Sequence, residues 1–446
     1  MPSDWPYIRI GDLVASGDAS IQTGPFGSQL HKHDYVERGV AIIPTEAIGR
    51  GAIRLDAVLP QISESKASEL RRHKLLRGDI LFARRGVQAT GLSAIVGDAH
   101  GGALCGTGAI LLRVNHDVMD PQFLAGVLAT DETYHWLRAH AVGAVMPNLN
   151  TDIISQLTVP MPKLKEQRSI ASTIQALSQR IDLLHQTSAT LESIAQALFK
   201  SWFVDFDPVR AKVEGREPEG MDAATAALFP TDFEESSLGL IPKGWSLGKF
   251  GELAALAKGS VSPLEFPTIR FELYSLPAFD AGQLPILEMG KNIKSNKTRV
   301  APGAVLQSKL NPHIPRVWFT SEVGEHAACS TEFLPWLAKP QSSPELVYCV
   351  LRSSAFEAQV HTLVTGTSNS HQRVKPDQVA ALRIVLPAEA VRARFADLTR
   401  PMLCKVSANR VWASKLAELR DSLLPRLISG KLRLPCAQAQ LEDALA

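Results

Sequence analysis

A seven-residue hydrophobic repeat runs through the middle of the chain. Between Glu166 and Val204, apolar side chains recur in alternating steps of four and three, at positions 170, 174, 177, 181, 184, 191, 194 and 198. Ser188 and Ala195 occupy the places where the repeat has no large apolar residue. This spacing is typical of a coiled-coil seam, not of the broader stripe of a helix on a globular core. We therefore predict a helix of about 39 residues, roughly 58 Å long at ~1.5 Å per residue.

A second long helix is predicted near the end of the chain, where a similar seam recurs. Its apolar members are Met402, Val406, Leu416, Leu419 and Leu423, and Asn409 takes one seam position. A lone seam asparagine commonly sets helix register at some cost in stability. Pro401 predicts that this helix begins or kinks nearby. Each helix could pack on its own globular segment instead, but two equal seams in one chain favour packing of the helices on each other.

The two halves of the chain are copies of one unit. At a shift of 225, residues 151–162 (TDIISQLTVPMP) align with 376–387 (PDQVAALRIVLP), and 78–83 (GDILFA) align with 303–308 (GAVLQS). The helical seams keep the same shift. The beginnings align at a shift of 240, as WPYIRIGDL and WSLGKFGEL. Each half is thus a globular segment followed by a long helix, and the chain carries an internal duplication.

Short apolar runs that alternate with glycine, proline and aspartate predict an α+β fold for each globular segment. A proline- and glycine-containing stretch between the halves predicts a linker with one short helix at AATAALF (223–229). We predict these divisions: a first globular domain at 1–163, a central helix at 164–206, a linker at 207–242, a second globular domain at 243–390, a distal helix at 391–434 and a tail at 435–446.

The composition of the chain excludes several classes of protein but does not by itself indicate a function. The formal net charge is +2, so the whole chain is not marked as a nucleic-acid binder. Five cysteines form no CxxC pair, which argues against a zinc site or a disulfide framework and favours reduced thiols in the cytoplasm. No apolar run approaches the roughly 20 residues that span a bilayer. The N-terminus lacks the pattern of a secretory signal.

The sequence carries none of the catalytic or cofactor motifs that a DNA-modifying enzyme would need. NPHI (311–314) lacks the second proline and the aromatic residue of an adenine methyltransferase loop. No GxxxxGK[ST] phosphate loop occurs, and no ExK follows Pro376 and Asp377 as a nuclease would need. The HKH sequence at 31–33 has no partnering ligand pattern and predicts a solvated loop. We therefore predict no enzyme activity, no cofactor and no metal site for this chain.

Two basic stretches lie at equivalent places in the repeats. At the shift of 225, Lys66 aligns with Lys291, and Arg84 aligns with Lys309. A basic run is often only a solvated face, but two such runs at matching positions favour contact with DNA phosphates and bases. A glycine-containing loop from Thr23 to Gln29 is a third candidate. The predicted DNA-binding residues are Thr23, Gly24, Phe26, Ser28, Gln29, Lys66, Arg72, Lys74, Arg84, Arg85, Lys291, Lys294, Lys297, Arg299, Lys309 and Arg316.

Taken together, these segments resemble the specificity subunits of type I restriction-modification systems. The resemblance rests on IQTGPFGSQL (21–30), GTGAILLRV (106–114), residues 147–170, LFKSWFVDFDPV (198–209), GLIPKGW (239–245) and LRDSLLPRLISGKL (419–432). It departs in the second half, which has AKGSVSPLEF (257–266) for the GPFGSQL loop and AEAVR (388–392) for KLKEQ. The second departure leaves the start of the distal helix open.

The resemblance implies two target recognition domains joined by two long antiparallel coiled-coil helices with internal pseudo-twofold symmetry. It implies recognition of a bipartite site in double-stranded DNA, one domain per half-site. It also implies partners: modification subunits, two in number, which carry methyl transfer, and restriction subunits, which carry ATP-driven translocation and cleavage. Two alternatives remain open, a coiled-coil scaffold that spaces two protein-binding domains and a self-sufficient methyltransferase. The paired basic stretches argue against the scaffold.

Overall fold

The computed structural model describes residues 5–54, 58–86, 88–143, 146–237, 239–364 and 372–434. The predicted tail at 435–446 lies outside these residues. The chain divides into two compact units. The first unit comprises residues 1–180 and 416–446, and the second comprises residues 181–415.

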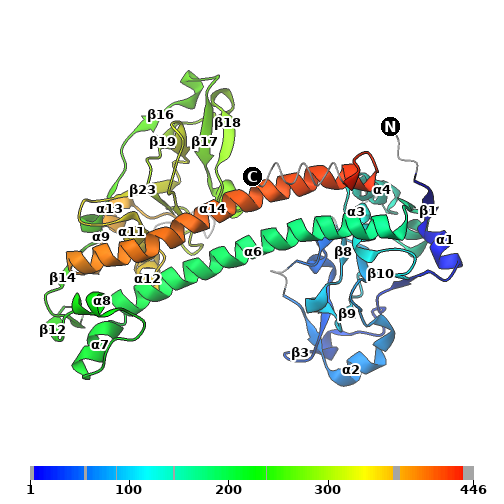
Figure 1. Ribbon diagram of the computed structural model, residues 1–446, viewed down its shortest axis with the longest axis horizontal. Coiled ribbons are helices and arrows are strands. Elements are labelled where there is room, and N and C mark those ends of the chain that lie inside the picture. The colour runs from blue at the N-terminus through cyan, green and yellow to red at the C-terminus, as the bar shows by residue number, and fades with distance from the viewer. Residues whose placement is uncertain are drawn as a thin grey trace. The chain divides into compact units, whose positions relative to one another are not determined.

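Two helices of 40 residues each, α6 (Leu164–Phe203) and α14 (Glu389–Ile428), are the longest elements. Their bounds differ by the shift of 225 that aligns the two halves of the sequence. In the first unit the beginning of α6 lies beside the end of α14, and in the second unit the end of α6 lies beside the beginning of α14 (Figure 1). The helices are therefore antiparallel and pack on each other, and the predicted α+β fold with a paired-helix seam is confirmed.

The seam of α6 follows the predicted seven-residue period with one change. Gln167, Ile181, Ser188, Ala195 and Trp202 recur at steps of seven or fourteen and are all buried. Ala195 is fully buried, whereas the neighbouring Ile194 is 45% exposed. The prediction that Ile194 belongs to the seam was therefore wrong, because the seven-residue period carries the seam through the smaller residue.

Helix α14 begins at Glu389 and continues through Pro401. Pro401 is exposed, whereas Leu403 and Val406 are buried on the face toward the core. Of the two possibilities that Pro401 indicated, a start nearby was wrong, and the helix begins two residues before the predicted bound at 391. Asn409, at 1% exposure, is buried in the seam as predicted, and both polar atoms of its side chain lack a hydrogen-bond partner among the described residues.

The globular part of the first unit holds three sheets, whose strand orders are β1-β11, β2-β10-β7-β8-β5 and β3-β6-β4-β9. The strands are β1 (Tyr7–Arg9), β2 (Ala19–Thr23), β3 (Tyr35–Val36), β4 (Val40–Ile43), β5 (Gly51–Ala52), β6 (Gln61–Ile62), β7 (Ile80–Ala83), β8 (Ser93–Ile95), β9 (Leu104–Cys105), β10 (Ala109–Val114) and β11 (Thr158–Pro160). The helices are α1 (Ile10–Ala15), η1 (Lys32–Asp34), η2 (Thr45–Ala47), α2 (Glu64–Glu69), η3 (Arg71–His73), η4 (Asp98–His100), α3 (Pro121–Leu128), α4 (Asp131–His140) and α5 (Thr151–Gln156).

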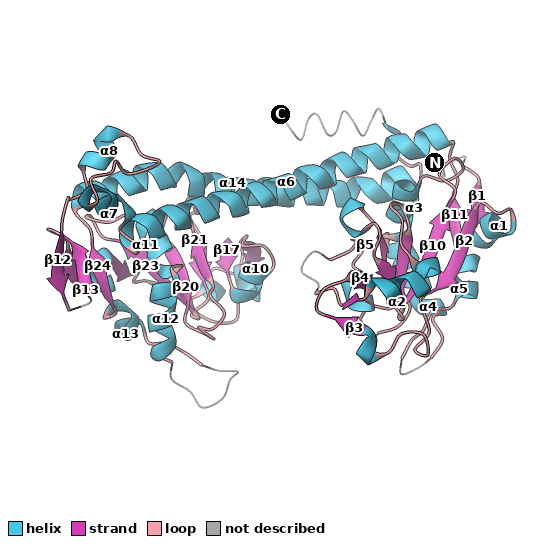
Figure 2. Ribbon diagram, turned by 90° about the horizontal axis from the view of Figure 1, so that it is seen from below, coloured by secondary structure: helices cyan, strands magenta, loops and turns pink. Residues whose placement is uncertain are grey.

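The globular part of the second unit holds sheets ordered β14-β24, β15-β23-β20-β21 and β16-β19-β22-β17-β18. The strands are β14 (Ser246–Lys249), β15 (Ala254–Leu256), β16 (Ser260–Val261), β17 (Arg270–Tyr274), β18 (Ile286–Met289), β19 (Lys297–Arg299), β20 (Val305–Ser308), β21 (Val317–Phe319), β22 (Ala327–Cys329), β23 (Phe333–Ala338) and β24 (Arg383–Leu386). The helices are α9 (Phe250–Leu253), η5 (Pro263–Glu265), α10 (Leu276–Asp280), η6 (Gly290–Asn292), α11 (Pro344–Leu351), α12 (Ser354–Thr362) and α13 (Pro376–Ala380). Figure 2 shows the strands of each part.

The duplication predicted from the sequence is visible in strand register. Tyr7 pairs with Pro160 in the first unit, and Leu247 pairs with Val385 in the second. These partners are related by the shifts of 240 and 225 that align the sequence. The parallel strand pairs β4–β9 and β17–β22 also correspond. In each pair the last residue of the second strand is a buried cysteine, Cys105 in β9 and Cys329 in β22. One scaffold has therefore been built twice with equivalent pairing.

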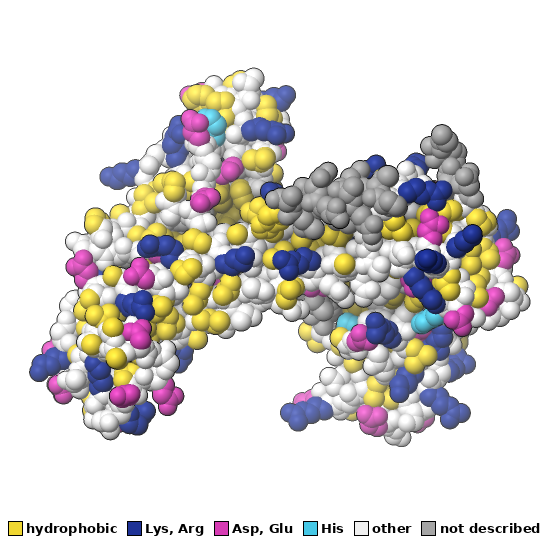
Figure 3. Space-filling view, viewed as in Figure 1, with side chains coloured by type: hydrophobic (Ala, Val, Ile, Leu, Met, Phe, Trp, Pro, Cys, Tyr) yellow, Lys and Arg dark blue, Asp and Glu magenta, His cyan; other side chains and the backbone are white. Residues whose placement is uncertain are grey.

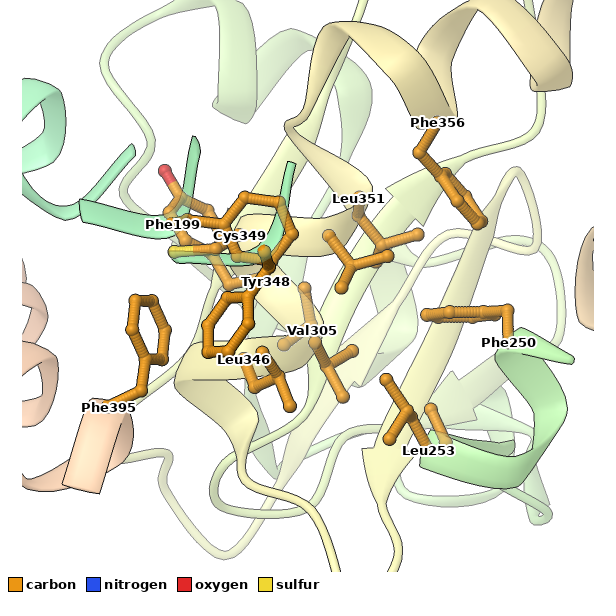
Figure 4. Close-up of a cluster of buried hydrophobic side chains, with 14 of the residues drawn as sticks. Phe199, Phe250, Leu253, Val305, Leu346, Tyr348, Cys349, Leu351, Phe356 and Phe395 are labelled. Carbon is orange, nitrogen blue, oxygen red and sulfur yellow. The ribbon is translucent and has the colours of Figure 1, made fainter. Parts of the chain in front are cut away.

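The long helices contribute to the core of the second unit as well as to their own seam. Phe199 of α6 and Phe395 of α14 point into a cluster with Tyr348 and Leu346 of α11 and Val305 of β20 (Figure 4). The ring centroids of Phe199 and Phe395 are 6.1 Å apart. The two packing modes considered from the sequence thus coexist, because each helix has apolar side chains on more than one face.

The stretch predicted as a linker contains more structure than the sequence indicates. It holds helices α7 (Asp207–Val213) and α8 (Ala223–Ala227) and the antiparallel strands β12 (Phe233–Ser236) and β13 (Gly239–Pro242). Phe229 packs edge-on against Trp202, with ring centroids 5.0 Å apart. Buried aromatic residues therefore hold this stretch against α6. Along the described residues, no helix is both long and apolar enough to cross a membrane.

Candidate nucleic-acid interface

The two basic stretches occupy equivalent places in the fold. Lys74 bridges to Leu104 of β9, and Arg299 of β19 pairs with Ala328 of β22. Lys74 and Arg299 are exposed and are related by the shift of 225. For Lys74 and Arg299, the alignment in the sequence is therefore also an alignment in strand pairing.

Several candidate side chains are held by partners within the fold. Arg84 is half-buried, and its Nε donates to Asn148 Oδ1 at 3.0 Å and to the Leu149 carbonyl at 3.2 Å. Arg316 makes a two-point ion pair with Asp280, at 2.7 and 2.8 Å, and its side chain is 13% exposed. These contacts indicate that Arg84 and Arg316 hold loops in place.

Three further candidate cations are partly engaged. Lys66 pairs with Glu69 at 2.9 Å and lies 4.0 Å from Asp34. Lys297 donates to both oxygens of Ser295, and partial burial lowers its pKa. The Arg72 Nε lies 3.0 Å from His73 Nε2. Burial and the neighbouring Arg72 charge lower the pKa of His73, which keeps that imidazole neutral near pH 7.

The remaining candidate cations have side chains without an ion-pair partner among the described residues. These cations are Lys74, Arg85, Lys291, Lys294, Arg299 and Lys309. Lys309 is half-buried, and the other five are exposed. On the face drawn in Figure 3, lysine and arginine side chains are interspersed with acidic and apolar ones. Free cations of this kind are the ones able to neutralise phosphates or to contact base edges.

The loop from Thr23 to Gln29 begins at the end of β2 and folds back on itself. Gln29 Oε1 accepts from the Phe26 N–H at 3.0 Å, and the Gln29 N–H donates to the Phe26 carbonyl at 2.8 Å. Phe26 is 55% exposed, and Ser28 is exposed beside it. Gly24 packs against the backbone of Gly106 so closely that a Cβ would collide with the Gly106 carbonyl oxygen. The loop is therefore a braced turn that presents an aromatic ring to solvent.

A pocket of about 290 Å³ with both polar and apolar lining opens where the loops after β4, β7 and β9 meet. We call it the Arg85 pocket. It is lined by Tyr35, Ile42, Pro44, Thr45, Glu46, Pro60, Arg85, Gly86, Gly106, Thr107, Gly108 and Met146. The sequence singled out Arg85 but not Glu46, Tyr35 or Met146, which are also exposed. These residues were missed because they come from separate loops and form no motif.

No group of three or more His, Cys, Asp or Glu side chains could hold a metal ion in the described ranges. His31 and His33 stack on each other with ring centroids 5.3 Å apart. The buried thiol of Cys105 has its pKa raised to about 12 by burial, and Cys329 is affected in the same way. A thiol with such a pKa is protonated and unreactive near neutral pH.

The comparisons with known proteins agree with this architecture. Residues 2–193 match the family described as type I restriction modification DNA specificity domain. The chain is 25% identical to the type I restriction enzyme HindI specificity subunit of Haemophilus influenzae, over 72% of this chain and 80% of the relative. It is 22% identical to the type I restriction enzyme MjaIX specificity subunit of Methanocaldococcus jannaschii, over 70% of this chain and 69% of the relative.

The fold also resembles that of a solved type I restriction-modification S subunit from M. genitalium. The TM-score is 0.59 at 12% identity, and the match covers 95% of this chain and 96% of that chain. In its sequence matches and its fold, the chain is therefore similar to DNA specificity components of restriction-modification systems. The resemblance predicted from the sequence, to specificity subunits of type I systems, is confirmed.

Proposed function

We propose that this chain reads a bipartite site in double-stranded DNA, with one globular segment per half-site, and that it carries out no chemistry itself. The observation that carries the proposal is the duplicated scaffold. Two segments have matching strand register, and each is followed by a helix of 40 residues. A repeated reading surface followed by a repeated helix supports recognition of two separate short sequences.

The unpaired cations supply the proposed contact with DNA. Lys74 and Arg85 in the first unit and Lys291, Lys294 and Arg299 in the second are exposed. Each phosphate that such a side chain neutralises releases counterions, so binding should weaken as salt rises. Arg84 and Arg316 act by holding the loops, because their guanidinium groups are already hydrogen-bonded. Phe26 and its neighbours in the braced turn are proposed to lie against the DNA.

We propose that the long helices dock the modification subunits, and that the modification and restriction subunits supply methyl transfer and cleavage. Apolar side chains that α6 and α14 leave exposed, on the face that we call the outer face, support this docking. On α6, Leu183 and Ile194 are 50% and 45% exposed, and on α14, Val411 and Trp412 are 43% and 40% exposed. Leu183 and Ile194 are three helical turns apart and so share one face. The resemblance to specificity subunits leads us to expect two modification subunits.

The test is a titration of the purified chain, with and without its modification subunits, against a DNA library at two salt concentrations. We expect salt-sensitive binding and selection of two short sequences separated by a spacer of fixed length. We expect no methyl incorporation from S-adenosylmethionine by the chain alone. A scaffold for two protein-binding domains would bind no DNA even at low salt. Methyl transfer by a preparation free of partner subunits would contradict the division of labour.

A further inference from the structure

We propose that the Arg85 pocket reads one G·C base pair in the half-site bound by the first unit. Arg85 would donate two hydrogen bonds to guanine, and Glu46 would accept one from the amino group of the paired cytosine. The inference rests on the proposed DNA-recognition function and names the chemistry of its first reading surface. It follows from the contacts of Arg85, the charge of Glu46 and a comparison of the two repeats.

The backbone that carries Arg85 is held on both sides while its side chain remains free. The Arg84 N–H donates to the Gly108 carbonyl at 2.9 Å, and the Leu149 N–H donates to the Arg84 carbonyl at 2.8 Å. Arg85 itself bridges to Asn148. Its guanidinium is exposed and has no hydrogen-bond or ion-pair partner among the described residues. A free guanidinium on a fixed backbone is suited to bidentate hydrogen bonding, and its commonest base target is the O6 and N7 edge of guanine.

Glu46 is the feature that favours base reading over phosphate contact. It lies in the short helix η2, whose turn is closed by hydrogen bonds from Ala47 to Pro44 at 3.0 Å and from Ile48 to Thr45 at 3.1 Å. Its carboxylate is exposed and forms no ion pair with Arg85. A lone carboxylate would repel a phosphate, but it can accept a hydrogen bond from the N4 amino group of cytosine. Guanine O6 and N7 and cytosine N4 lie side by side on the major-groove edge of one G·C pair.

Two glycines of the loop after β9, Gly106 and Gly108, line the pocket and add no side chain to it. A Cβ at Gly106 would collide with the Ile43 carbonyl oxygen, and a Cβ at Gly108 would collide with Thr45 Oγ1. These close contacts also bring the loop after β9 against η2, so that Glu46 and Arg85 line one cavity. The scaffold therefore holds the backbones that carry Glu46 and Arg85 at one cavity.

The second repeat has different chemistry at the same two places. Leu310 bridges to Arg373 as Arg85 bridges to Asn148, at the common shift of 225. The register of the parallel pairs places Pro277 of α10 where Glu46 stands in η2. Neither Leu310 nor Pro277 can hydrogen-bond a base through its side chain. Different side chains at these two places are what two half-sites of different sequence would require.

The test compares the methylation motif set by the complete complex, with its modification subunits, for the wild type and three variants. For Arg85→Ala and Glu46→Gln, we expect preference to relax at one G·C pair of one half-site, the same pair for both. Arg85→Ala should weaken binding to the preferred sequence by about 10- to 100-fold. The matched control is Arg77→Ala, because Arg77 is an exposed cation of the same unit that is paired with Asp98 at 3.1 Å. That control should leave the motif unchanged.

Three outcomes would overturn the inference. Uniform weakening of all sequences by Arg85→Ala, with a salt slope reduced by about one, would assign Arg85 to phosphate. Changes at different base pairs in the two variants would separate Arg85 from Glu46. An unchanged motif in both variants would remove the pocket from the reading surface. These outcomes are distinct from failure of the proposed function itself, in which the wild-type complex would select no DNA sequence.

Discussion

At the scale of single residues, the first unit contains an ion pair with a buried carboxylate, and the aligned positions of the second unit carry no charge. Asp79 is 1% exposed, and its two carboxylate oxygens accept from Arg113 Nε at 2.7 Å and from the Arg113 terminal nitrogen at 2.6 Å. The aligned residues of the second unit are Ala304 and Leu337. Arg113 also donates to the Lys74 carbonyl at 3.0 Å, so the pair supports the backbone of a candidate DNA-binding residue.

We expect Arg113→Leu to lower the free energy of unfolding of the first unit by about 1–3 kcal/mol, because it leaves the buried Asp79 carboxylate without its counter-charge. The double variant Asp79→Ala with Arg113→Leu copies the second unit and should recover most of that loss. Chemical denaturation of the two single variants and the double variant measures the coupling. Additive effects would show that the ion pair does not stabilise this unit.

At the scale of elements, the long helices separate two kinds of apolar residue. Seam residues such as Ile181 and Leu416 are buried, whereas Ile194 and Trp412 are exposed on the outer face. Trp412 is 40% exposed, and Lys415 Nζ lies over its ring, 5.4 Å from the centroid. An exposed tryptophan on a helix that already has a seam partner favours a further partner on that face.

Ile194→Asp and Trp412→Ala should each weaken binding of the modification subunits by about 1–2 kcal/mol while leaving the helix pair folded. Co-elution and titration with the purified subunits measure this. Leu287→Asp is a suitable control. Leu287 is 60% exposed, and it belongs to strand β18 of the second globular part and not to α6 or α14. Equal loss in the control and in the helix variants would indicate a general effect of surface charge.

At the scale of the whole molecule, we propose that the helix pair sets the spacer between the two half-sites. Seven extra residues in both α6 and α14 keep the seam register, because the repeat is seven residues long. They lengthen each helix by about 10.5 Å. At about 3.4 Å per base pair, the spacer should grow by up to roughly three base pairs.

Methylation-motif sequencing of cells that carry the lengthened chain reads the spacer directly. The half-site sequences should stay the same, since no residue of either reading surface is altered. Insertion of five residues in both helices is the matched control, because it moves the seam off register and should reduce activity instead. An unchanged spacer with retained activity would contradict the proposed role of the helices.

The sequence by itself determined the duplication, the α+β class and the two long helices. These features follow from local periodicity and from matches at a constant shift, and both can be read directly from the order of the residues. The bounds of α6 and α14 differ by the same 225 positions. It placed Ala195 in the seam correctly but counted the neighbouring Ile194 there as well, because hydrophobicity alone does not show that Ile194 is 45% exposed.

Only the tertiary structure decided which basic side chains are free. Arg84 and Arg85 are adjacent in the sequence, yet Arg84 is held by Asn148, 64 residues away, while Arg85 faces the pocket. Arg316 is likewise held by Asp280, 36 residues away. Glu46 joined the candidate site only when the loops after β4 and β7 met. Charge can be read from a sequence, but its compensation depends on partners that folding brings from distant positions, and those partners leave no local pattern.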